Sequence, residues 1–340
     1  MPLPYFHQAL AMDLGTANTV IFRNGEIVLD EPSIVAIDKD SGQCVAIGNQ
    51  AKMMHGRENR SIKTVKPLKG GVIANFQEAE MMISGFIRKV NGRRKSPFSP
   101  NLKMVFGIPS GSTEVEIRAV RDSSEHIGGR DVFLIYEPMA AALGIGLDIE
   151  SHQGNMVIDI GGGTTEIAVI SLGGLVVYDS IRIAGDVFNA DIQQYLREQH
   201  HLKVGDLTAE QIKHNVGSVS ANLEDAPQPM AVTGLNIMTG HPMDIKVTYQ
   251  EIARALDKSV NKIENSIMHV LERTPPELYS DIVKNCIYLS GGGALLRGLA
   301  SRLSKMTNIP FHIAEDPIHA VARGTALALE NTDRYSCLMR

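Results

Sequence analysis

Short apolar runs separated by tight turns open the chain, and the same arrangement recurs near its middle. Such runs, bounded by Gly, Asn or Asp, predict β-strands. The strands expected near the start are Leu10–Leu14, Asn18–Phe22 and Glu26–Leu29. Their counterparts are Met156–Ile160, Thr165–Ile170 and Leu175–Tyr178. Asn24-Gly25 and Gly173-Gly174 provide the second tight turn of each triplet.

Helices and strands alternate after each triplet, as helical spacing of apolar residues and the positions of Gly and Pro indicate. The first half is expected to continue with helix Gln77–Val90, strand Leu102–Gly107, helix Ser112–Ile127, strand Asp131–Ile135 and a helix from Pro138 to Gly144. The second half is expected to continue with helices Val187–Gln199 and Glu251–Glu272, strand Asn285–Leu289, helix Ala294–Met306, strand Pro310–Ile313 and helix Ile318–Glu330.

The two halves align at a fixed offset of 146 positions, which places Asp13-Leu-Gly-Thr on Asp159-Ile-Gly-Gly and Thr19 on Thr165. Strands followed by helices, twice, predict an α/β protein with two domains related by internal duplication. We expect these domains at residues 1–150 and 151–340, with smaller inserted subdomains at about 30–75 and 201–248.

Composition narrows the class of protein. The chain has 340 residues, of which 44% are apolar and 21% charged, enough for a sizeable core. Its net charge of −5 argues against a dedicated nucleic-acid binder. The 3 cysteines are widely spaced and follow no metal-ligand pattern, as expected of reduced thiols in a cytoplasmic protein. Neither a secretory signal nor an apolar run long enough to cross a membrane is expected.

Glycines concentrate where strands turn, and two of these turns carry an acidic residue. Asp13-Leu-Gly-Thr-Ala-Asn-Thr and Asp159-Ile-Gly-Gly-Gly-Thr-Thr-Glu each fall between two expected strands. Glycine lets the backbone approach an oxyanion, and a carboxylate beside it can hold the waters of a Mg²⁺ that bridges phosphates. A single such turn is most often only a turn, but two copies in register predict that a nucleotide tail is gripped from both sides.

Other residues are ambiguous on spacing alone. Glu137 follows a strand and precedes a helix, where it could orient an attacking water or simply favour the helix start. Glu210 and Lys213, one helical turn apart after Thr208, which is expected to cap their helix, favour a surface ion pair over a contact with a ribose. Gly291-Gly-Gly-Ala-Leu-Leu follows a strand and offers bare backbone against which a flat adenine could pack.

Five motifs in order resemble those of the actin superfamily, and specifically those of MreB, the bacterial actin homologues that organise cell shape. They are Asp13-Leu-Gly-Thr-Ala-Asn-Thr, Glu137-Pro-Met-Ala-Ala-Ala, Asp159-Ile-Gly-Gly-Gly-Thr-Thr-Glu, Ser290-Gly-Gly-Gly-Ala-Leu-Leu-Arg and Ala322-Arg-Gly, and the resemblance runs from about Leu10 to Glu330. It implies an actin-like fold of two RNase H-like domains with Mg-ATP or Mg-GTP in the central cleft, slow nucleotide hydrolysis and filament assembly.

The resemblance also implies roles for individual residues. Asp13 and Asp159 would organise Mg²⁺ through water, and Glu137, Asp159 and Thr164 would serve hydrolysis. The residues that would bind the phosphates are Gly15, Thr16, Ala17, Asn18, Gly161, Gly162, Gly163 and Thr164. Those that would contact the nucleoside are Glu210, Gln211, Ile212, Lys213, Gly291, Gly292, Gly293, Ala294 and Leu295, which reverses the ion-pair preference. Gly70, Asn75 and Tyr136 depart from the residues frequent in the family.

Implied partners are further copies of the chain, the inner face of the cytoplasmic membrane and the proteins of peptidoglycan synthesis. Leu3, Tyr5 and Phe6, and Phe98 beside Arg93-Arg-Lys, are the candidate membrane contacts, because cations near anionic headgroups contribute about 1 kcal/mol each. The alternative function is a small-molecule kinase on the same fold, and a heat-shock-type chaperone ATPase is a third. The modest inserts and the lack of an extra candidate base argue against the kinase.

Overall fold

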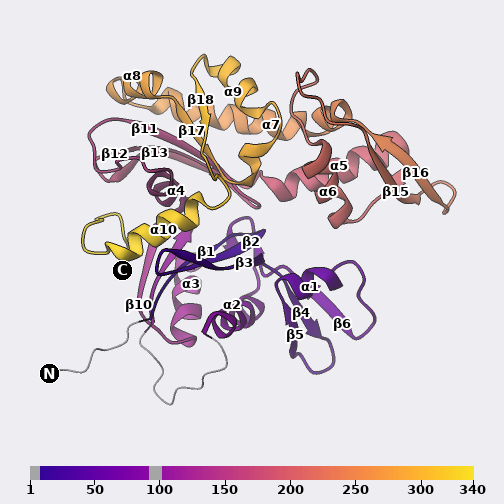
Figure 1. Ribbon diagram of the computed structural model, residues 1–340, viewed down its shortest axis with the longest axis horizontal. Helices are drawn as coiled ribbons and strands as arrows, with labels where there is room; N and C mark the ends of the chain where they lie inside the picture. Colours follow the sequence, from indigo (N-terminus) through magenta and orange to yellow (C-terminus); the bar gives the residue numbers. More distant parts are fainter. Residues whose placement is uncertain (1–7, 92–101) are drawn as a thin grey trace.

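The computed structural model describes residues 8–91 and 102–340, and the candidate membrane contacts at residues 3–6 and 98 lie outside this range. Two five-stranded sheets form the framework, one in each half of the chain (Figure 1). The first consists of β1 (Gln8–Leu14), β2 (Asn18–Arg23), β3 (Glu26–Pro32), β9 (Leu102–Ile108) and β10 (Gly129–Tyr136). The second consists of β11 (Asn155–Ile160), β12 (Thr165–Ser171), β13 (Gly174–Ile181), β17 (Ile287–Ser290) and β18 (Phe311–Ile313).

The two sheets share one topology and one register. Their strand orders are β10-β9-β1-β2-β3 and β18-β17-β11-β12-β13, with the first hairpin antiparallel and the later strands parallel in both. Leu14 lies opposite Thr19 in one sheet, and Ile160 lies opposite Thr165 in the other, which is the predicted offset of 146. The duplicated α/β architecture is therefore confirmed at the level of individual residue pairs.

Helices cover both faces of each sheet. The first-half helices are α2 (Phe76–Asn91), α3 (Glu114–His126) and α4 (Glu137–Ile145). The second half contains α5 (Gly185–His200), α7 (Tyr249–Arg273), α8 (Pro276–Asn285), η1 (Gly292–Leu295), α9 (Leu299–Thr307) and α10 (Ala320–Glu330). Successive side chains of β1 point to opposite faces of the first sheet. Leu10 and Met12 pack with α2 on one face, and Ala11 packs with α4 and α10 on the other.

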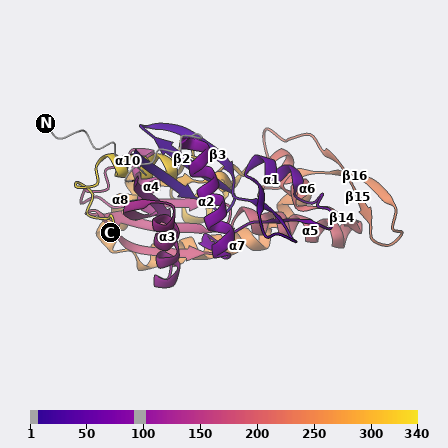
Figure 2. The ribbon, with the colours of Figure 1, turned by 90° about the horizontal axis from the view of Figure 1, so that it is seen from below.

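Smaller sheets lie within each predicted insert. One holds β4 (Val35–Asp38), β5 (Cys44–Ile47) and β6 (Ile62–Val65) beside α1 (Asn49–Met54). The other holds β14 (Leu202–Lys203), β15 (Met230–Asn236) and β16 (Pro242–Val247) beside α6 (Asp206–Val216). Both lie toward the same end of the elongated molecule, and α8 and α10 lie toward the other (Figure 2). The domain and insert boundaries themselves stay predictions.

Most predicted elements agree with the structure within one or two residues, but two predictions were wrong. The single helix expected over Ala294–Met306 is a short 3₁₀ turn, η1, followed by α9. Gly298, with φ of 81°, separates them because a left-handed residue cannot continue a right-handed helix. Helix α6 begins at Asp206 after Gly205, so Thr208 lies inside its first turn and does not cap it.

Helices α4 and α10 lie against each other between the two sheets (Figure 1). Glycine allows their backbones to touch: a Cβ on Gly144 would lie 1.9 Å from the Ala320 carbonyl oxygen, and one on Gly324 would lie 1.7 Å from that of Ala140. After α4 the chain enters the second sheet through β11, and from β18 it returns through α10 to the segment that pairs with β10. This contact therefore lies beside both connections.

The segment after α10 returns to the first sheet. Met339 exchanges two backbone hydrogen bonds of 2.9 Å with Leu134 of β10, the strand at the edge of that sheet. Tyr335 and Leu338 pack against the core between the sheets. Within the described residues, no helix is both long enough and apolar enough to span a membrane.

Candidate functional site

The two glycine-rich turns that follow β1 and β11 face each other in direct contact. A Cβ on Gly162 would lie 2.7 Å from the Cβ of Ala17, and one on Gly163 would lie 2.3 Å from Thr16 Oγ1. The close approach of the two turns therefore requires both glycines. Thr16 Oγ1 also accepts a hydrogen bond of 2.9 Å from Gly71 N, which brings the β7 (Leu68–Lys69) and β8 (Val72–Ile73) hairpin to the same place.

The first turn is held in shape by Ser33, a residue for which the sequence suggested no role. Ser33 Oγ donates to the carbonyl of Gly15 at 2.6 Å, and Ser33 N donates to that of Ala17 at 2.9 Å. A Cβ on Gly15 would lie 2.6 Å from the Asn18 carbonyl oxygen, so only glycine permits a turn this tight. The predicted phosphate-binding backbone is thus rigidly supported.

The second turn rests on the start of α5. Gly185 N and Asp186 N donate to the carbonyls of Gly161 and Gly162 at 3.1 and 2.8 Å. Lys213 Nζ reaches the same place from α6 and donates to the Gly185 carbonyl at 3.0 Å. Burial lowers the pKa of Lys213, as expected for an ammonium group largely removed from water. A cation and a helix N-terminus therefore adjoin the second turn.

Four carboxylates converge at the base of these turns: Asp13, Glu137, Asp159 and Glu166. Burial raises the pKa of Asp13 to about 7, and the charge of Asp159 adds to this effect. Burial raises the pKa of Asp159 to about 6, against a hydrogen bond from Ser290 that lowers it. Burial, together with the charges of Glu166, Asp13 and Asp159, raises the pKa of Glu137 well above its ordinary value. The four carboxylates repel one another when ionised, and a bound cation would compensate their charge.

The donor set fits a magnesium ion held through water. Asp159 Oδ1 is buried and has no hydrogen-bond partner, which is the orphaned acceptor that an ion or its waters would satisfy. Within residues 8–91 and 102–340, no three metal-ligating side chains converge closely enough to bind an ion directly. Mg²⁺ usually keeps several waters and takes only one or two carboxylates, so Asp13 and Asp159 suit it.

Glu137 is the first residue of α4 and is only 8% exposed. Gly107 of β9 packs beside it, because a Cβ on that glycine would lie 3.7 Å from Glu137 Cγ. A carboxylate placed there merely to favour the helix start would normally remain in water. Its burial among three other carboxylates favours the catalytic interpretation over the helix-start interpretation.

The predicted nucleoside residues divide into two groups. Glu210 and Gln211 line a cavity of about 470 Å³ between α1 and α6, a size typical of ligand sites. Among the described residues, Glu210 pairs with Lys52 of α1 at 3.2 Å and not with Lys213, so the ion pair that spacing favoured was wrong. Ile212 is fully buried in the core of the second half, so only its backbone could meet a ligand.

Gly291–Leu295 forms the turn after β17 and the 3₁₀ helix η1. A Cβ on Gly293 would lie 2.2 Å from Ile160 Cγ2, whereas one on Gly292 would meet open space. Ala294 is fully buried and Leu295 is 52% exposed. Gly292 and Leu295 therefore offer the accessible surface of this segment, and the adenine contact stays a prediction.

Sequence reasoning missed the polar residues that connect the halves around the site. His319, just before α10, bonds to Asp316 at 2.9 Å and to Asp30 of β3 at 3.3 Å, and Asp30 in turn accepts from Asn18 at 2.9 Å. Burial lowers the pKa of His319, but the two carboxylates outweigh it and the net shift is upward. No periodicity or spacing brings residues 18, 30 and 319 together, so no sequence signal identified them.

We expect the chain without divalent cations to lose stability as the pH rises from about 5 to about 8. Asp13 and Asp159 release protons near pH 3.8 when unfolded, but only at about 7 and about 6 when folded. The folded state therefore binds more protons in this window, and the free energy of unfolding falls as the pH rises. In thermal unfolding with a chelator, the Tm at pH 8 should be at least about 3 °C lower than the Tm at pH 5. A Tm that rises across this range would contradict the predicted linkage.

The fold and the paired glycine turns define an actin-like protein, and comparison with known proteins agrees. The MreB/Mbl protein family model matches residues 7–337, so the chain belongs to this family. It is 44% identical over 335 residues to the cell shape-determining protein MreB of Escherichia coli (strain K12), covering 97% of this chain and 95% of that protein.

Solved structures lead to the same fold. MreB5 of Spiroplasma citri bound to AMPPNP superimposes with a TM-score of 0.90 at 34% identity, covering 97% of this chain and 98% of that chain. The MamK double helical filament has a TM-score of 0.79 at 20% identity, covering 95% and 99%. At that identity the MamK likeness supports the fold alone.

Proposed function

We propose that this chain is an actin-like cytoskeletal protein that binds and slowly hydrolyses ATP or GTP and assembles into filaments. The observation that carries the proposal is the meeting of two glycine turns above a buried acidic cluster whose Asp159 Oδ1 lacks a partner. This arrangement supplies backbone N–H groups for phosphates and carboxylates for a hydrated cation. The AMPPNP-bound relative from Spiroplasma citri supports the same assignment.

The roles follow from the geometry of the site. The two turns would bind the phosphates, with Thr16, Asn18 and Thr164 adding side-chain donors. Asp13 and Asp159 would hold a Mg²⁺ through water, and that ion would neutralise the phosphate charge. Glu137 would orient the attacking water, since phosphoryl transfer needs positioning and charge compensation more than covalent chemistry. Glu210, Gln211 and Lys213 would contact the nucleoside side of the ligand.

The filament and its surroundings follow from family membership. The chain would polymerise with copies of itself, attach peripherally to the inner face of the cytoplasmic membrane and direct the proteins of cell-wall elongation. The membrane contacts would be the apolar side chains of Leu3, Tyr5 and Phe6 and that of Phe98, which follows the basic run Arg93-Arg-Lys. The net charge of −5 fits a protein with no nucleic-acid partner.

Light scattering and sedimentation on adding Mg-ATP test the proposal directly. Scattering should rise above a critical protein concentration, phosphate should be released slowly, and neither should occur with the chelator present. Transfer of phosphate to a sugar or another small molecule, with no assembly at any concentration, would falsify the filament function in favour of a kinase. Sedimentation with anionic liposomes, comparing the full chain with Phe98→Ser, tests the membrane contact.

Asp159→Asn is expected to have opposite effects on stability and on activity. The amide keeps the shape but removes a buried negative charge, one oxygen of which has no hydrogen-bond partner, so the Tm of the cation-free chain at pH 8 should rise. The Mg²⁺ concentration needed for half-maximal phosphate release should increase by about 10-fold or more. Asp179→Asn is the control: Asp179 accepts from Ser180 N at 3.0 Å on one oxygen and from Ser266 Oγ at 2.5 Å on the other, and because an amide has only one acceptor oxygen, the substitution should lower the Tm. A lower Tm for Asp159→Asn would contradict the proposed cation site.

A further inference from the structure

Glu166, a fully buried carboxylate of β12, has no role in the function proposed above. In the register of the second sheet it lies between Asp159 of β11 and Ser180 of β13. The equivalent position in the first half, at the same offset of 146, is Val20, which is buried and apolar. The fold therefore does not require a carboxylate at this position, and its presence in one half only calls for a functional explanation.

The hydrogen bonds of Glu166 connect the two halves. Its Oε2 accepts from Ser110 N at 2.9 Å and from Ser110 Oγ at 2.5 Å, and Ser110 belongs to the loop after β9 in the first half. Its Oε1 accepts from Ser180 Oγ of its own sheet at 2.6 Å. The loop itself packs tightly, because a Cβ on Gly111 would lie 2.9 Å from Ser180 Cβ. One buried carboxylate thus fastens a first-half loop to the second sheet.

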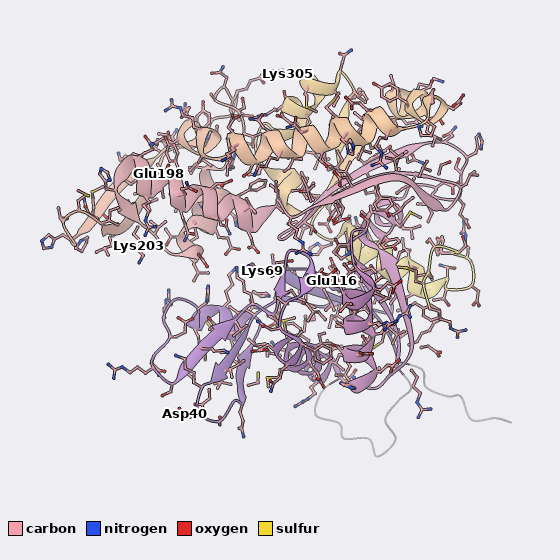
Figure 3. The ribbon with its side chains drawn as sticks, turned by 180° about the vertical axis from the view of Figure 1, so that it is seen from behind. Asp40, Lys69, Glu116, Glu198, Lys203 and Lys305 are labelled. Atoms are coloured by element: carbon pink, nitrogen blue, oxygen red, sulfur yellow. The ribbon has the colours of Figure 1, made fainter. Side chains whose placement is uncertain are left out.

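The fastened loop lies next to the catalytic candidate. It follows β9 directly, and β9 pairs with β10, the strand that leads into Glu137. Gly107 near the end of β9 packs against the Glu137 side chain, as described above. Figure 3 shows Glu116, on the helix that this loop precedes, near the boundary between the two halves, where Glu116 pairs with Arg182 at 3.3 Å. Movement of the loop away from Glu166 would therefore disturb the packing of Gly107 against the Glu137 side chain.

We propose that Glu166 is a positioning residue: its paired bonds to Ser110 hold the two halves together beside the site and keep Glu137 in place for hydrolysis. The bonds are charge-assisted and shielded from water, which makes them stronger than ordinary neutral hydrogen bonds. They can form only while the two halves are in contact at this point. The role in hydrolysis rests on the proposed function, whereas the bond between the halves does not.

Ser110→Ala and Ser180→Ala form a matched pair for the test. Each removes one hydroxyl donor from the same carboxylate, but only Ser110 lies in the other half. Without nucleotide, hydrogen exchange of the backbone amides of residues 110–112 should quicken about 10-fold in Ser110→Ala and less than about 2-fold in Ser180→Ala. Equal exchange in the two variants would overturn the proposal, whether or not the chain hydrolyses nucleotide.

Steady-state kinetics test whether the Ser110–Glu166 bonds position Glu137 for hydrolysis. For Ser110→Ala, kcat for phosphate release should fall about 10-fold with KM unchanged within about 2-fold, and Ser180→Ala should match the parent chain. Glu166→Gln, which keeps an acceptor oxygen for Ser110 but loses the charge, should quicken this amide exchange less than Ser110→Ala does. A Ser110→Ala chain with parental kcat, or one in which only KM changes, would refute a role for the bond in positioning Glu137.

Discussion

A Glu137→Ala chain is expected to release phosphate about 100-fold more slowly than the parent while binding nucleotide with affinity changed less than about 3-fold. The expectation rests on the place of the side chain, 8% exposed among Asp13, Asp159 and Glu166. A positioned carboxylate that orients or deprotonates water contributes typically 10²–10⁴-fold to rate. Single-turnover phosphate release, with affinity measured separately by titration of a fluorescent nucleotide, distinguishes the two effects.

Glu114→Ala is the matched control for Glu137→Ala. Glu114 is also the first residue of its helix, α3, but its side chain is exposed. If Glu137 only favoured a helix start, both variants would lose a similar small amount of stability and neither would lose activity. Full hydrolysis by Glu137→Ala would remove this residue from the catalytic assignment.

Gly324→Ala is expected to lower the free energy of unfolding by about 3 kcal/mol or more. The new Cβ would lie 1.7 Å from the Ala140 carbonyl oxygen, so α4 and α10 would have to separate. Because backbone and not a flexible side chain lies in the way, the cost should reach the upper end of that for overpacked cores. The chain has no Trp, so urea unfolding is best followed by far-ultraviolet circular dichroism.

Gly174→Ala is the control for Gly324→Ala, because it replaces a glycine that has space for a side chain. The nearest atom to its added Cβ is 4.0 Å away, and its backbone does not need a positive φ. Its unfolding free energy should change by less than about 1 kcal/mol. A Gly324→Ala chain as stable as Gly174→Ala would mean that the two helices are not in backbone contact. Gly144→Ala should behave as Gly324→Ala, because the contact is reciprocal.

The sequence predicted the sheets well because their information is local and repeated. Apolar runs, tight turns and the duplicated Asp-x-Gly motif all bear on the same strands, and the observed register keeps the predicted offset. The Ala294–Met306 helix failed for a local reason too, since Gly298 adopts a left-handed conformation that apolar spacing does not reveal. The spacing of apolar residues indicates which face of a helix is buried, but it does not show whether the helix continues without a break.

The site could be predicted only as two separate turns. Each turn was visible in its motif, but the contacts of Gly163 with Thr16 and of Glu166 with Ser110 depend on how the halves are placed. Glu166 did carry a signal, because it is the one charged residue of β12 and directly precedes four apolar residues. His319 carried none, since its partners come from β3 and from the connection before α10.

The backbone contact between α4 and α10 has a mechanical consequence. Both chain connections lie beside a pair of helices that cannot move closer together, so we expect the halves to move relative to each other mainly by rotation about that pair. In such a rotation, the distance that a residue moves increases with its distance from α4 and α10. The largest travel falls on α1 and α6 at the far ends, where Lys52 meets Glu210. A rotation too small to disturb the core would open or close the cavity between them.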